Sequence, residues 1–204
     1  MKFYLKQIAF SLCMVLIWAA VLVWFARPGQ AIAGEDKPAP FQLSLFEPIQ
    51  IVPKERDVAG LRLNLIYGAN ENVDGIDLGI VNRTNGGGSG VKLGIFNSVE
   101  KDFKGAQFAL VNVNNGRFTG WQDGLVNYTE ADFKGFQSGI VNMANGNFKG
   151  FQFAWAYNQA GPLSGVQLGL LNITEALDGI QLGLININRA NDPFGFLPIV
   201  NWSF

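Results

Sequence analysis

Hydrophobic and polar positions repeat with a period of 15 residues along most of the chain, from Val58 to Asn201. Each unit reads apolar-x-Gly-apolar-Gln-apolar-Gly-apolar-apolar-Asn, as in Phe133–Asn142, FKGFQSGIVN. The first glycine of the unit recurs at positions 60, 75, 90, 105, 120, 135, 150, 165 and 179. Self-similarity at a fixed period is the signature of repeat architectures, so we expect one structural unit to recur along the whole segment.

Each unit is predicted to be a β-strand rather than a helix. Two glycines per unit would each weaken a helix by about 1 kcal/mol. The apolar residues alternate instead, so that Val166, Leu168 and Leu170 point to one face of a strand. Gln167 and Leu171 point to the other face. The pattern therefore predicts about ten strands of about 10–11 residues, each followed by a short turn.

The turns between these strands predict the topology. Asn-Gly pairs begin at Asn85, Asn115 and Asn145, which is every second turn. Asn-Gly is a strong hairpin signal, because both residues tolerate the positive φ of a type I′ turn. We therefore predict an all-β, antiparallel up-and-down repeat sheet, rolled or closed into a barrel that leaves no free edge. A β-solenoid is the structural alternative, since stacked Gln and Asn side chains suit parallel strands in register.

The antiparallel register assigns each residue to a face. It places Asn112 opposite Thr119, and Leu110 opposite Trp121. One face carries three apolar rows, and the other carries the glycines, a glutamine row and the phenylalanines Phe103, Phe118, Phe133 and Phe148. The middle apolar row consists of Leu78, Leu93, Phe108, Asp123, Ser138, Phe153, Leu168 and Leu182.

Asp123 and Ser138 interrupt this middle row and are expected to lie beside each other on adjacent strands. An unpaired carboxylate in an apolar core is costly. Either this part of the face is wet, or the two side chains make a specific polar contact. Trp121 and Phe136 lie close to them, and the four residues form the candidate polar notch.

Two further rows of polar residues recur with the repeat. A structural role is favoured over ligand binding for both, because Gln between two glycines covers bare backbone and Asn bonds its own backbone at strand ends. The Gln row consists of Gln107, Gln122, Gln137, Gln152, Gln167 and Gln181. The Asn row consists of Asn82, Asn97, Asn112, Asn127, Asn142, Asn158, Asn172, Asn186 and Asn201.

Composition narrows the function classes. The 204 residues contain no His and a single Cys, Cys13, which excludes His-based nucleophilic catalysis, His-ligated metal sites and an internal disulfide. A formal net charge of −1 offers no basic field for nucleic acid. We expect neither an enzyme nor a cofactor.

The N-terminus has the order of an export signal. Lys2 and Lys6 precede the uncharged run Ile8–Phe25, and the small-residue triplet Ala31-Ile32-Ala33 follows it. Residues 1–33 are therefore predicted to be a signal peptide, with an uncleaved membrane anchor as the alternative, because a spanning helix needs about 20 apolar residues. Residues 34–57 form a Pro-rich lead-in whose pieces Phe41–Phe46 and Ile49–Val52 are able to join a sheet edge, and residues 58–204 form the repeat domain.

The unit Gly-x-Gln-x-Gly-x-x-Asn, as in Gly120–Asn127 and Gly165–Asn172, resembles a family of bacterial surface-repeat proteins. The resemblance covers most of the chain after the signal and implies an exported, envelope-associated protein without catalytic residues. The shorter core Gln-x-Gly-x-x-Asn is similar to the curlin repeat of amyloid adhesins, although curlin units are longer, more polar and lack the recurring Phe.

These observations predict a non-catalytic envelope or surface protein with a structural or interaction role. The expected location is the cell envelope, in the outer membrane or on the cell surface, with the periplasm or an inner-membrane anchor as alternatives. Two other functions stay open, a binding module for an extended glycan or apolar ligand and a curlin-like fibre-forming adhesin. The membrane is the expected partner during export, and the sequence names no ligand.

Overall fold

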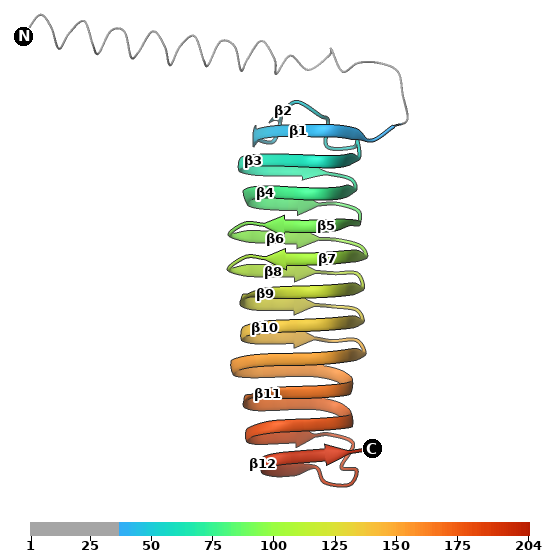
Figure 1. The fold of residues 1–204 in the computed structure, drawn as a ribbon, viewed down its shortest axis with the longest axis vertical. Coiled ribbons are helices and arrows are strands. Elements are labelled where there is room, and N and C mark those ends of the chain that lie inside the picture. The colour runs from blue at the N-terminus through green and yellow to red at the C-terminus, as the bar shows by residue number, and fades with distance from the viewer. Residues whose placement is uncertain (1–36) are drawn as a thin grey trace, which may run out of the picture.

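In the computed structural model, which describes residues 37–204, the repeated segment winds into a column of stacked β-coils (Figure 1). Strands of successive coils pair in parallel, so that Gln122 lies beside Gln137 and Gly120 beside Gly135. The neighbour of each residue in the stack is therefore the equivalent residue of the next unit. The fold is a β-solenoid.

The strands follow one another along the column in sequence order (Figure 1). The first end carries β1 (Ala39–Phe46) and β2 (Ile49–Gln50), followed by β3 (Val58–Asn70) and β4 (Val73–Thr84). The next strands are β5 (Gly88–Leu93), β6 (Phe96–Val99), β7 (Phe103–Phe108), β8 (Val111–Asn114), β9 (Phe118–Thr129) and β10 (Phe133–Ala144). The long strand β11 (Phe148–Asn188) winds through more than one coil, and β12 (Phe196–Ser203) ends the column.

The predicted antiparallel barrel is wrong, and the chain forms the alternative, a β-solenoid. Within residues 37–204, antiparallel pairing joins only β1 to β2 and β11 to β12. Asn112 lies beside Asn127 rather than Thr119, and Trp121 lies beside Ala106 rather than Leu110. The hairpin interpretation fails because Gly116 and Gly146 do not adopt the positive φ that a type I′ turn requires. The Asn-Gly pairs lie instead in the turns between successive coils.

Each coil consists of two straight segments that meet at a corner, rather than the one straight strand that was predicted. The pair β5 and β6 shows this, because Gly94 and Ile95 form a corner between them. Beyond the corner the alternation restarts, so Asn97 points into the coil although it lies five residues after the buried Lys92. For the same reason Leu171 is partly exposed and does not share the buried face of Gln167.

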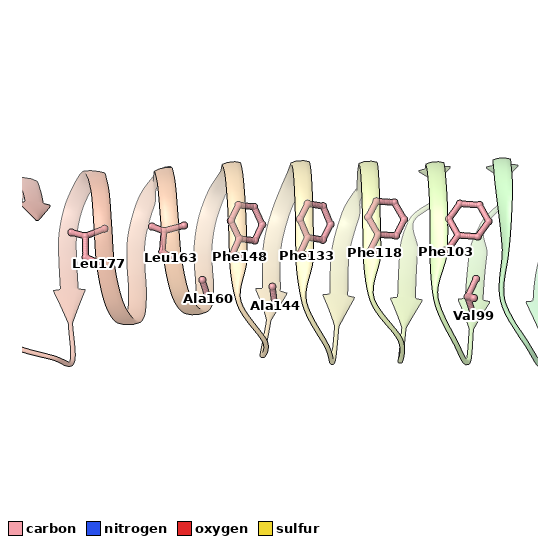
Figure 2. Close-up of a cluster of buried hydrophobic side chains, with 9 residues drawn as sticks. All are labelled: Val99, Phe103, Phe118, Phe133, Ala144, Phe148, Ala160, Leu163 and Leu177. Atoms are coloured by element: carbon pink, nitrogen blue, oxygen red, sulfur yellow. The ribbon is translucent and has the colours of Figure 1, made fainter. Parts of the chain in front are cut away.

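The interior holds a column of apolar side chains along one strand of each coil (Figure 2). Phe118, Phe133 and Phe148 are almost fully buried, and their successive ring centroids lie 5.0 and 4.9 Å apart in stacked geometry. Leu163 and Leu177 continue the column toward the C-terminal end. Smaller residues, Ala144 and Ala160 among them, lie across the coil from this column.

The first glycine of each unit allows the coils to approach closely. Gly135 has a φ of 135°, and a Cβ added there would lie 2.0 Å from the carbonyl oxygen of Gly120 in the coil before it. Only glycine combines this conformation with that approach. The strict recurrence of glycine is therefore a consequence of parallel stacking.

Both ends of the column are covered by irregular segments. The lead-in pieces of the chain form β1, which pairs in parallel with β3, and β2, which folds back on β1. At the other end β12 runs antiparallel to the last turn of β11. The predicted N-terminal signal or anchor, including its apolar helix, lies outside the described residues.

Candidate functional site

The Gln row lies inside the solenoid and is not a surface. Each of its six side chains is fully buried. From Gln122 to Gln181, each Nε2 donates to the Oε1 of the glutamine one coil earlier, at 2.7 to 3.1 Å. Such a ladder supplies buried amides with partners of their own kind, which removes most of the cost of burying them.

The Asn row forms a second buried ladder at the corner of the coil. From Asn82 to Asn172, each Nδ2 donates to the Oδ1 of the next asparagine at 2.8 to 3.1 Å, and Asn186 accepts the last of these bonds. The same amide also reaches a backbone carbonyl of the next coil, as Asn112 does with Asp123 at 2.8 Å. Asn201 lies in β12 and donates to Gln181 instead. The row thus satisfies the backbone where the chain turns the corner.

A buried group of three charges continues the line of the Gln row toward the N-terminal end of the column, and the sequence interpretation missed it. Arg62, Asp77 and Lys92 are at most 1% exposed and hold the place that glutamine has in later coils. Arg62 Nη2 and Lys92 Nζ both lie 2.6 Å from Oδ2 of Asp77. The spacing of 15 between these charged residues was the available signal.

Burial and pairing set the protonation of this charged triad. Burial raises the pKa of the Asp77 carboxyl, but Lys92 and Arg62 outweigh that effect and hold it below its usual value. Burial lowers the pKa of Lys92 to about 8, against the attraction of Asp77. The Nε2 of Gln107, on the coil after Lys92, finds no acceptor. The triad is enclosed by the coils and offers no access to a ligand.

The outer surface separates apolar from charged residues. At the corner of each coil one large apolar side chain points outward, and each is 42 to 70% exposed. This corner row consists of Ile80, Ile95, Leu110, Leu125, Ile140, Trp155, Leu170 and Leu184. The apolar edge, as we call it, comprises the corner row and the middle row beside it.

Charged side chains gather on the opposite edge of the coil, at the turns that lead from one coil to the next. Neighbouring coils are joined there by exposed ion pairs, such as Arg117 with Asp102 at 2.6 Å and Arg83 with Glu100 at 3.3 Å. We call this side the polar edge. The solenoid therefore has an amphipathic cross-section along its length.

The candidate polar notch lies on the apolar edge. Asp123 and Ser138 are paired across β9 and β10, and the Ser138 hydroxyl donates a hydrogen bond to Oδ1 of Asp123. Trp121 and Phe136 lie two residues earlier on the same strands, with ring centroids 5.9 Å apart in edge-on geometry. The structure thus brings together all four residues that the sequence singled out.

Two further aromatic residues, which the sequence interpretation did not include, complete the surroundings of the notch. Phe108 pairs with Asp123 on the preceding coil, and its ring lies 5.0 Å from that of Trp121. Phe153 pairs with Ser138 on the following coil. Both belong to the middle row, so the period of 15 was the signal that could have found them.

A hollow of about 440 Å³ opens beside the notch. It is bordered by Asp123 and Ser138 of the middle row and by Leu125 and Ile140 of the corner row. Trp155 also lines it, and meets Phe153 edge-on at 5.5 Å. Beyond that aromatic pair lies a second hollow of about 440 Å³, lined almost wholly by apolar side chains, among them Leu168, Leu170, Leu182 and Leu184.

The described part of the chain offers no arrangement typical of catalysis by a metal. No group of three His, Cys, Asp or Glu side chains in residues 37–204 is placed to hold a metal ion. Nor does that segment contain a helix with the length and hydrophobicity to cross a membrane. Comparison with family models, curated proteins and solved structures finds no match, so the site has to be interpreted from its own geometry.

Proposed function

We propose that this protein is a non-catalytic, exported interaction protein of the bacterial cell envelope that binds a membrane surface through its apolar edge. The observation that carries the proposal is the separation of apolar and charged residues on opposite edges of the solenoid. Proteins that lie in a membrane interface share this feature, with an apolar side in the headgroup region and a charged side in water.

The size of the apolar edge supports stable binding. At about 4.8 Å per coil, the eight side chains of the corner row extend over about 34 Å. Moving half-exposed Leu and Ile side chains out of water contributes about 1 kcal/mol each, or about 8 kcal/mol for the row before the cost of orienting the protein. A single myristoyl chain, for comparison, gives a binding constant of about 10⁴ M⁻¹.

The N-terminal sequence supports the same location. The run Ile8–Phe25 behind Lys2 and Lys6 is the pattern of a segment that enters a membrane during export. Whether it is cleaved or retained, it delivers the repeat domain to the envelope. An exposed apolar surface of this extent is otherwise an aggregation hazard for a soluble monomer.

A labelling experiment tests which edge meets the lipid. In a Cys13→Ser background, a fluorescent probe is attached at Leu125→Cys on the apolar edge or at Asp132→Cys on the polar edge. Each full-length protein is then mixed with vesicles whose acyl chains carry bromine, a short-range quencher. We expect strong quenching at position 125 and little at position 132.

This comparison separates the apolar edge from the N-terminal run, because the run is present in both proteins. Equal quenching at the two positions, or no quenching at position 125, would refute binding through the apolar edge. Replacement of Leu110 and Leu125 by Ser should weaken quenching of a probe at Ile140→Cys, whereas Thr119→Ser on the same side of the coil should not.

A fibre-forming adhesin is a second candidate function. The like-over-like stacking of Gln and Asn side chains in this solenoid is the arrangement that stabilises cross-β fibres. A fibre would require coils of one molecule to stack on those of another, past β1 and β2 at one end and β12 at the other. Thioflavin-positive fibres formed by the purified full-length protein would favour this candidate over the membrane-bound form.

A further inference from the structure

We propose that the notch around Asp123 is a binding site for an organic ammonium group carried on an apolar chain. This inference goes beyond membrane binding, because it assigns a specific ligand chemistry to one place on the apolar edge. It depends on three features of the notch, which are an isolated carboxylate, an aromatic surround and an adjoining apolar hollow.

Asp123 is the one charged residue of the repeat coils that lies on the apolar edge. Between Val58 and Arg189, the other charged side chains belong either to the buried triad or to the turns and strand ends of the polar edge. Asp123 forms no ion pair with any described residue, and its side-chain partner is the Ser138 hydroxyl. Apart from the adjacent Ser138, the equivalent positions of other coils carry Leu or Phe, so neither the fold nor the repeat requires a carboxylate here.

Asp123 is half-buried, so the apolar side chains around it remove part of the water from its carboxylate. A cation close to the carboxylate would compensate for that loss. The nearest cations on the same side of the coil are Lys134 and its equivalents, four residues from the middle row and about 13 Å away along the strand. Their side chains lie toward the polar edge and are exposed. No side chain of the coil is placed to supply that cation, so a ligand is the partner that would supply it.

The aromatic residues define what kind of cation fits. Phe108 and Phe153 lie before and after the notch in the middle row, and Trp121 and Phe136 lie beside it on the same strands. Rings of this type attract cations that approach their faces within about 6 Å, and several together recognise alkylated ammonium groups. A metal ion would need more oxygen ligands than Asp123 and Ser138 provide.

The adjoining hollow defines the rest of the ligand. Its volume of about 440 Å³ lies within the range of small-molecule sites, about 300–1,000 Å³. Leu125, Ile140 and Trp155 line the same hollow as Asp123, and such a lining suits a short alkyl chain. Ser138 is 8% exposed and holds one carboxylate oxygen, which leaves the other free for the ammonium group.

The same chemistry occurs in free alkylamines and in the ammonium headgroups of lipids. Calorimetric titration of the full-length protein with hexyltrimethylammonium, which stays monomeric, tests the site itself. Hexyl sulfate, with the same chain and the opposite charge, measures binding due to the apolar chain alone. We expect hexyltrimethylammonium to bind at least about tenfold more tightly than hexyl sulfate.

Variants assign that binding to the notch. Asp123→Asn should lower the affinity at least about tenfold, and Trp121→Leu should also lower it. Asp132→Asn, which removes a carboxylate on the polar edge, is the matched control and should leave the affinity unchanged. Because Asp123→Leu restores the apolar row, it should fold with an unchanged or higher melting temperature and still fail to bind.

Two outcomes would overturn the proposal: wild type that binds hexyl sulfate as tightly as hexyltrimethylammonium, and Asp123→Leu that binds hexyltrimethylammonium as tightly as wild type. Vesicles distinguish the two sources of the ligand. If the headgroup is the source, Asp123→Asn should weaken binding to phosphatidylcholine vesicles more than to phosphatidylglycerol vesicles. If the probe at position 125 is not quenched by any vesicle while hexyltrimethylammonium still binds, the ammonium site stands and membrane binding fails.

Discussion

The buried triad of Arg62, Asp77 and Lys92 allows a direct test of how the interior is stabilised. Removing only the negative charge, with Asp77→Asn, leaves two buried cations without a counter-charge. Both Nη2 of Arg62 and Nζ of Lys92 lie 2.6 Å from the carboxylate oxygen that the substitution removes. Breaking a buried ion pair in this way costs about 3–5 kcal/mol. We expect a loss of that size in the free energy of unfolding.

Replacing all three charges by glutamine should have a very different effect. The three residues stand in the positions that glutamine occupies in later coils, so the triple variant extends the existing ladder toward the N-terminal end. Thr84 would face the substituted side chain at position 77 as Thr129 faces Gln122, at 3.4 Å. The unpaired Nε2 of Gln107 would gain an acceptor on the preceding coil. Exchange of a buried ionic group for a satisfied neutral one is often neutral or stabilising by about 1–4 kcal/mol.

Urea unfolding followed by far-ultraviolet circular dichroism compares the two variants with wild type. The single variant should unfold at a clearly lower midpoint, and the triple variant at a midpoint equal to or above that of wild type. The reasoning is refuted if the triple variant loses as much stability as the single one, because the ladder positions would then not be interchangeable. Equal stability of Asp77→Asn and wild type would refute the burial of the charges.

Three further outcomes follow from the same structure. The pKa of Lys92 is about 8 in the fold and about 10.4 in an unfolded chain. Between these two values the unfolded chain holds a proton on Lys92 that the folded protein has lost. Denaturant unfolding should therefore show stability rising by about 2 kcal/mol from about pH 8 to pH 10, and Lys92→Gln should lose that rise. Phe133→Ala, in the buried column, should cost about 3–5 kcal/mol, whereas Leu125→Ala, on the apolar edge, should cost less than about 1 kcal/mol, as thermal unfolding would show. Gly135→Ala should lower the free energy of unfolding by at least about 2 kcal/mol, through its positive φ and its approach to Gly120, whereas Lys134→Ala should change it by less than about 0.5 kcal/mol.

The period and the rows of the repeat could be predicted from the sequence, but the direction of the strands could not. A repeat of 15 residues places Phe108 beside Asp123 both in a hairpin centred on Asn115 and in a parallel coil. The Asn-Gly pairs then favoured the hairpin on local grounds. The coil is favoured instead by long-range stacking, in which side chains of the Gln row and of the Asn row hydrogen-bond to the equivalent residue one period away.

One feature of the repeat marks the corner of the coil once the burial of its residues is known. Gln137 and Asn142 recur together in the units and lie five residues apart. On a straight strand, residues an odd number of positions apart point to opposite faces, so the two rows could not both face one interior. Both are fully buried, because the chain turns a corner at Gly139 and Ile140. The notch could be predicted without knowing the strand direction, since Asp123 and Ser138 occupy equivalent positions of adjacent units in either topology.

This solenoid has a largely polar interior and an apolar row of side chains on its exterior. The coil is two strands thick, so its interior is a narrow channel that stacked amides fill while satisfying one another's hydrogen bonds. The buried apolar column, centred on Phe118, Phe133 and Phe148, supplies the hydrophobic contribution inside. The corner row makes no comparable contribution, because each of its side chains is 42 to 70% exposed. The eight large apolar residues at that corner therefore add little to folding, and their uninterrupted length fits the membrane surface that we propose as the partner of the apolar edge.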